Sequence, residues 1–122
     1  MTFKEKLRKL VSDLLAGTNK GTIKWTETAD EQAFRAVLHT GLVRVQRIYA
    51  EAFQGNPSYP IEGFEYALVA LDEQNKELAR YVAKDQAEAK DLRELWQRAS
   101  NSARNAEQKI DSLLKELEGM VR

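Results

Sequence analysis

The last third of the chain carries an apolar stripe with the spacing of a coiled coil, and this stripe constrains the fold more than any other feature. Apolar or small residues recur there at alternating steps of four and three, which is the spacing of one face of a long helix. The stripe consists of Leu92, Trp96, Ala99, Ala103, Ala106, Ile110, Leu113, Leu117 and Met120. The spacing predicts a helical segment over residues 85–121.

A straight helix over this stripe is too long for a small domain to cover. From Ala89 to Met120 it spans about 46 Å, at about 1.5 Å per residue. A compact domain of this chain length measures only about 35 Å across, judged from the scaling of size with length. Two outcomes therefore remain open. The helix breaks near Ser100–Asn105, where poor helix formers gather, or it stays straight and pairs with a second chain.

The two outcomes give the last apolar residues different partners. A break would fold them back onto the first helix, where Leu7, Leu10 and Leu14 form an apolar face. A straight helix would leave an apolar patch that a soluble monomer avoids exposing. We favour the straight helix and predict a homodimer, or association with another protein, through its end. The predicted surface is Ile110, Leu113, Leu114, Leu117 and Met120.

The preceding part of the chain predicts one helix followed by strands. Residues 1–17 repeat apolar residues at helical spacing, and Gly17 suits the left-handed residue that ends a helix. The period then changes to two, so residues 21–83 predict an antiparallel sheet of about five strands with a loop at 52–63. A change of phase at Arg47–Ile48 predicts a β-bulge or the end of a strand. The whole chain is predicted to be a single α+β domain.

Trp25 decides whether the sheet offers an aromatic surface for a ligand. It shares its strand parity with Ile23, and that face matches the one that carries Phe34 and Val45. Burial of a large aromatic side chain is worth a few kcal/mol, about 2–3, which a small sheet needs. We therefore predict that Trp25 lies in the core, with Trp96 of the C-terminal stripe as its partner.

The opposite parity gathers basic residues. Lys24, Arg35 and Arg44 share it, and the change of phase would bring Arg47 to the same face. Residues 1–50 hold nine Lys and Arg against five Asp and Glu, although the net charge of the chain is zero. Basic side chains on a sheet can follow a phosphate backbone, but no aromatic side chain of the first three strands joins them to stack on bases. Nucleic-acid binding by the basic first half is therefore the alternative function.

No motif in the sequence carries recognisable chemistry. The carboxylates fall mostly in predicted turns and on helix exteriors, where solvation explains them. His39 is the only histidine and there is no cysteine, which excludes a metal site built on these two residue types. Phosphate-binding glycine loops and nucleophile motifs are also missing from the sequence. We predict a non-enzymatic protein without a cofactor.

The composition favours a cytoplasmic protein. Hydrophobic residues make up 43% and charged residues 31% of the chain, which is typical of a folded globular domain. The lack of cysteine favours a reducing compartment, and the first residues lack the apolar stretch of a signal peptide. No apolar run approaches the roughly 20 residues that cross a bilayer, so no membrane association is predicted.

The layout of the chain resembles that of a family of small, uncharacterised bacterial proteins. The resemblance lies in LLAGTNKGTIKWTET, FRAVL, LVRVQRI, YALVALDEQNKEL and LRELWQRASNSARNAEQKIDSLLKEL. It implies a bacterial cytosolic α+β domain and supplies no activity or functional residue. We therefore predict a bacterial protein-interaction module of unknown process.

Overall fold

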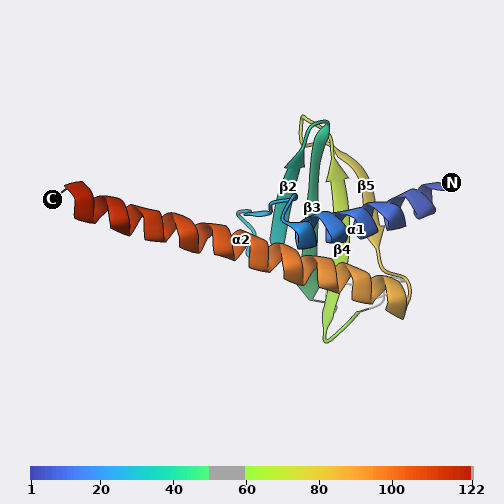
Figure 1. Ribbon diagram of the computed structural model, residues 1–122. Helices are drawn as coiled ribbons and strands as arrows, with labels where there is room; N and C mark the ends of the chain where they lie inside the picture. The colour runs from blue at the N-terminus through green and yellow to red at the C-terminus, as the bar shows by residue number, and fades with distance from the viewer. Residues whose placement is uncertain (50–59, 122) are drawn as a thin grey trace.

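In the computed structural model, which describes residues 1–49 and 60–121, two helices lie on the same face of a five-stranded sheet (Figure 1). The elements follow in the order α1 (Phe3–Lys20), β1 (Thr26–Glu27), β2 (Ala33–Leu38), β3 (Gly41–Tyr49), β4 (Phe64–Leu71), β5 (Glu77–Val82) and α2 (Gln86–Val121). The predicted α+β fold, with an N-terminal helix, an antiparallel sheet and a C-terminal helical segment, is confirmed. The predicted loop at 52–63 falls mostly outside the described residues.

Local hydrogen bonds set the ends of α1. The side chain of Thr2 accepts a hydrogen bond from the backbone N–H of Glu5 at its start, as an N-cap should. The helix ends at Gly21, which has a left-handed φ of 77°, so the predicted end at Gly17 is wrong by one turn. Gly17 meets a different need, because a Cβ there would lie 2.4 Å from Cδ1 of Ile23. A glycine fits at this position because any side chain would collide with Ile23, where the chain runs back past the helix.

The sheet is a meander in which each strand pairs antiparallel with its neighbours in sequence. Phe34, Val45, Leu68 and Tyr81 follow one another in register from β2 to β5. All four are buried and belong to the core that α1 and α2 cover. The helices therefore cover the face of the sheet that bears this row, here called the core face.

The predicted bulge at Arg47–Ile48 is wrong. Both residues continue the pairing of β3 with β4 without a shift, opposite Tyr66 and Glu65, and the irregularity of the sheet lies between Ala70 and Leu71, where β4 pairs with β5. The change of phase in the sequence has another cause. Ile48 is an apolar residue on the face that the helices leave uncovered, and Arg47 is a charged residue on the core face.

Two side-chain hydrogen bonds fix the start of α2. Asp85 accepts a hydrogen bond from the backbone N–H of Glu88 at 2.9 Å, and the Glu88 carboxylate accepts one from the backbone N–H of Lys84. The first bond satisfies a donor that the helix start would otherwise leave unpaired. The second ties the residue before the N-cap to the first turn.

The helix then runs for 36 residues without interruption, so the favoured straight helix is confirmed and the alternative, a break near Ser100–Asn105, does not occur. Its poor helix formers make tertiary contacts instead. Ser100 is buried, and the Ser102 hydroxyl accepts a hydrogen bond from the backbone N–H of Trp25. Consequently the last turns of α2 do not fold back onto α1, whose Leu14 packs in the core.

Both tryptophans are buried, as predicted. Trp25 is fully buried, and its indole N–H donates to the Thr18 hydroxyl at 2.8 Å. Trp96 donates its indole N–H to the backbone carbonyl of Gln32. Among the described residues its aromatic neighbours are Phe34 and Tyr66, both edge to face, so the two indoles share one core without stacking on each other.

Candidate functional site

The C-terminal half of α2 extends well beyond the sheet, and no other described element lies beside it (Figure 1). At about 1.5 Å per residue the 36-residue helix is roughly 54 Å long. Ala99 and Ala103 are 0% and 3% exposed, whereas Ile110 and Leu113 are 56% and 57% exposed. One heptad stripe is therefore buried along its first half and open to solvent along its second.

The open half of the stripe forms what we call the exposed seam. It consists of Ile110, Leu113, Leu114, Leu117, Met120 and Val121, each more than half exposed. The structure brings together all five predicted residues and adds Val121. With Ile110 and Leu117 at heptad position a, Leu114 and Val121 fall at e and form an apolar edge of the seam. Lys109 and Glu116 fall at g and form a charged edge.

The uncovered face of the sheet carries a row of arginines. Arg35 of β2 lies directly opposite Arg44 of β3, and Arg44 is followed in register by Val69 and then by Arg80 of β5. We call Arg35, Arg44 and Arg80 the arginine row. The predicted grouping of Arg35 and Arg44 on one face is confirmed. Arg80 escaped the sequence analysis because its face depends on the register of β5, which the sequence does not reveal.

The other two predicted basic residues lie elsewhere. Arg47 is on the core face, where its guanidinium lies 3.9 Å from the ring centre of Trp96 and 4.1 Å from that of Phe64. Stacking on two aromatic rings makes this arginine part of the packing. Lys24 precedes β1 and lines a cavity beside α2. Neither residue belongs to the arginine row.

The arginine row concentrates positive charge that the sheet only partly balances. Arg44 donates to the Gln46 side chain at 3.1 Å, and Arg80 forms an ion pair with Glu77. Within residues 1–49 and 60–121, neither Arg35 nor Arg44 is in an ion pair with a carboxylate. Like charges directly opposite each other on neighbouring strands destabilise a sheet. The placement of Arg35 opposite Arg44 therefore destabilises the sheet, and a bound anion would reduce this repulsion.

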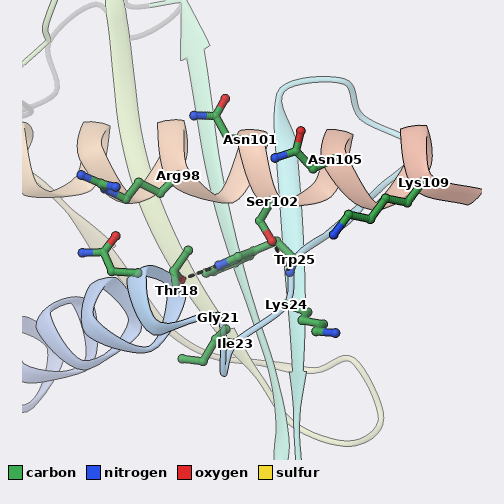
Figure 2. A pocket seen from close by; sticks show the side chains of 11 residues that line it. Thr18, Gly21, Ile23, Lys24, Trp25, Arg98, Asn101, Ser102, Asn105 and Lys109 are labelled. Carbon is green, nitrogen blue, oxygen red and sulfur yellow. Dashed lines mark hydrogen bonds between the residues drawn. The ribbon is translucent and has the colours of Figure 1, made fainter.

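A cavity of about 420 Å³ opens where α2 leaves the rest of the molecule (Figure 2). It lies between the end of α1, the segment around Trp25 and the middle of α2. Lys24, Arg98 and Lys109 contribute three cations to its lining, and none of the described residues that line it is a carboxylate. The hydroxyls of Thr18 and Ser102 are already engaged by Trp25. We call it the cationic pocket. Its described residues can attract an anion, and they include no acid–base pair.

A polar cluster, buried at Tyr81 and Glu88 and half exposed at Arg8, joins α1, β5 and α2. The Tyr81 hydroxyl donates to the Glu88 carboxylate, and Arg8 lies 3.6 Å from the same carboxylate oxygen. Burial, and then the hydrogen bond to Glu88, raise the pKa of Tyr81 well above its ordinary value of 10. Every member of the cluster has a partner, and Glu88 also accepts the hydrogen bond from the backbone N–H of Lys84. The cluster therefore anchors the start of this helix, and nothing in it resembles an activated nucleophile.

Neither α1 nor α2, as described, has an apolar stretch that could cross a bilayer. In the same part of the chain, no three His, Cys, Asp or Glu side chains are grouped so as to hold a metal ion. Comparison with protein-family models, with curated proteins and with solved structures finds no match to the chain. The resemblance to a bacterial family therefore stays a prediction, and a function has to be inferred from the surfaces described above.

Proposed function

We propose that the chain is a non-enzymatic protein-interaction module that associates with itself through the exposed seam of α2. The observation that carries this proposal is the exposure of six large apolar side chains on one face of a helix that no described element covers. Such a contiguous patch marks an interaction surface. With this function we retain the sequence-based predictions of a bacterial, cytoplasmic protein.

A second copy of the chain is the partner that the seam fits best. Its heptad spacing is the pattern through which helices pair with copies of themselves. Full burial of one large apolar side chain stabilises a complex by about 1.5–3 kcal/mol. A side chain that is half exposed before association contributes about half of that amount. Summed over two seams, the gain is comparable to the roughly 4–15 kcal/mol that association costs. We expect a dimer that dissociates on dilution.

The test compares the mass of the wild-type protein in solution with that of two double variants. Leu113→Glu/Leu117→Glu places two charges in the seam. Ser112→Glu/Gly119→Glu places the same two charges on the opposite side of the same turns, where both residues are exposed. In sedimentation equilibrium across the micromolar range, the mass of the wild type and of the control should rise with concentration toward twice the chain mass of 13.9 kDa. The seam variant should give the mass of one chain.

Circular dichroism shows whether each variant is folded. All four substituted positions are exposed, so the folded core should survive every substitution. A wild-type protein that stays at one chain mass throughout the range would reject self-association. A folded seam variant that still dimerises would show that another surface makes the contact.

The arginine row supports a second candidate function, which is binding of nucleic acid. The supporting observation is the direct pairing of Arg35 with Arg44 in register, with Arg80 two strands further on. Guanidinium groups bind phosphate oxygens in a bidentate manner. None of the described strands places an aromatic ring on this face, so contact with the backbone of a duplex is favoured over stacking on single-stranded bases.

A duplex oligonucleotide tests this candidate. We expect Arg35→Gln/Arg44→Gln to weaken binding and to lower the slope of log affinity against log salt by roughly two. Lys4→Gln/Lys6→Gln removes the same charge from an exposed face of α1 and should have the smaller effect. Equal binding of both variants, or no binding by the wild type at low salt, would rule the candidate out.

A further inference from the structure

We propose that two copies pair antiparallel along the exposed seam, so that their two sheets lie at opposite ends of the paired helices. This inference rests on the proposed self-association and adds its direction. Four features of the described residues support it: the cover over the first half of the stripe, the unlike edges of the seam, the opposite charges along its charged edge and the position of Lys109 at the cationic pocket.

The first feature excludes a parallel pair in register. In such a pair the two apolar stripes would face each other along their whole length. Leu92, Ala99 and Ala103 belong to the same stripe and are already buried by the sheet and α1 of their own chain. A parallel partner would have to enter the space that these elements fill. An antiparallel partner needs only the free turns from Ile110 onward on each copy.

The second feature is the chemical difference between the two edges of the seam. In a parallel pair, the e edge of one helix faces the g edge of the other. That would set Leu114 beside Lys109 of the second copy, and Val121 beside Glu116 of the second copy. In an antiparallel pair, the e edge of one helix faces the e edge of the other, and the two g edges face each other. Leu114 then packs near Leu114 of the second copy, and the charged edges meet each other.

The third feature is that the charged edge is complementary to itself. Lys109 and Glu116 lie one heptad apart, with opposite charges. When two such edges run in opposite directions, Lys109 of each copy lies on the same side as Glu116 of the other. Charged residues at these flanking positions set the orientation of paired helices.

The same orientation gives the cationic pocket a partner. Lys109 lines this pocket together with Lys24 and Arg98, and Figure 2 shows Lys109 at the end of the pocket nearest the free turns of α2. In the antiparallel pair, Glu116 of the second copy approaches this rim. The second copy then brings a carboxylate to the three cations of the described lining.

A distance between two identical labels tests the direction. The chain has no cysteine, so Gln97→Cys gives one site for a spin label, on an exposed position of α2 outside the seam. Antiparallel overlap of the free turns should separate the two labels by roughly 45–55 Å along the axis, at about 1.5 Å per residue. Parallel helices would bring them to about 20 Å or less, because paired axes lie only about 8–10 Å apart.

Pulsed electron paramagnetic resonance measures both distances. The same label in the Leu113→Glu/Leu117→Glu background is the control, and its intermolecular signal should disappear. A main distance below about 30 Å would overturn the antiparallel arrangement while leaving self-association intact. A wild-type background without any intermolecular distance, together with a mass of one chain, would reject the proposed function itself.

Discussion

In the first half of α2 the apolar stripe lies against α1 and the core face of the sheet, whereas in the second half it faces no other element of the described chain. Leu92 is fully buried and Leu117 is 54% exposed, although both occupy the inner positions of one unbroken heptad pattern. The difference shows that helical spacing establishes which face of a helix is apolar. What covers that face depends on how far the neighbouring elements reach.

Side-chain size changes along the stripe. Large residues such as Leu92 and Trp96 are buried at its start, and small residues follow at Ala99 and Ala103, where Ser102 also supplies a hydroxyl to the Trp25 backbone. Beyond the sheet the stripe returns to large residues, such as Ile110 and Leu113, which are exposed. Size alone therefore does not indicate which part of the stripe is covered.

The largest effect is expected when Leu92→Ala is compared with Leu117→Ala, because the two variants should lose very different amounts of the free energy of unfolding. Removal of a fully buried leucine side chain costs about 2–5 kcal/mol of the free energy of unfolding. The same change at Leu117 should cost less than about 0.5 kcal/mol at concentrations where the protein is monomeric. Urea unfolding of both variants measures the difference. Equal losses would mean that the second half of α2 is covered within its own chain.

A smaller effect should appear at the anchored start of α2, with a defined dependence on pH. Tyr81→Phe removes a buried hydrogen bond to the charged Glu88, which should cost about 1.5–3 kcal/mol at neutral pH. The raised pKa of Tyr81 means that the folded state holds this proton more tightly than the unfolded state. The resulting stability is present below pH 10 and is lost as the pH rises through the folded-state pKa.

The measurement is the difference in free energy of unfolding between wild type and Tyr81→Phe from neutral pH to beyond pH 10. It should shrink toward the alkaline end. A difference that stayed constant there would show that the Tyr81 proton is not held by the fold.

The smallest effect belongs to the free end of the helix. A Cβ added at Gly119 would meet nothing within 4 Å, so Gly119→Ala should stabilise the last turns by about 0.5–1 kcal/mol. Because these turns carry no tertiary contacts, global unfolding of the monomer should not change. Hydrogen exchange should slow at residues 115–121 and stay the same at residues 86–103. A rise in global stability would couple the free end to the core.

The sequence was sufficient for the features that follow from periodicity and size. A period of 3.6 or two indicated the helices and strands, and parity correctly placed Trp25 in the core. The C-terminal half of the apolar stripe was predicted to lie on the surface, because a straight helix over the whole stripe is longer than a small domain. The predicted seam therefore needed no knowledge of tertiary contacts.

Other features depend on contacts that a pattern does not contain. Ile48 shares the parity of Arg44, so a change of phase was inferred, with a β-bulge or the end of the strand as its cause and Arg47 on the outer face. The bulge does not exist, and Arg47 lies on the core face, where its flat guanidinium packs on Trp96. A break near Ser100–Asn105 stayed open as the less favoured alternative, because helix propensity is only a weak guide. The tertiary hydrogen bond from Trp25 to Ser102 is a contact that the sequence pattern does not reveal. Arg80 joined its row only through the register of β5.

The order of the elements also bears on how the chain folds. Every pair of neighbouring strands is consecutive in sequence, so the sheet is assembled from local contacts, which form quickly. The helix that covers the core face comes last, and its packing against α1 joins distant parts of the chain. Until α2 docks, the row of Phe34, Val45 and Leu68 has no complete cover. Docking of α2 is therefore the expected late step, and ribosome-bound chains that lack it would be the species most prone to aggregate.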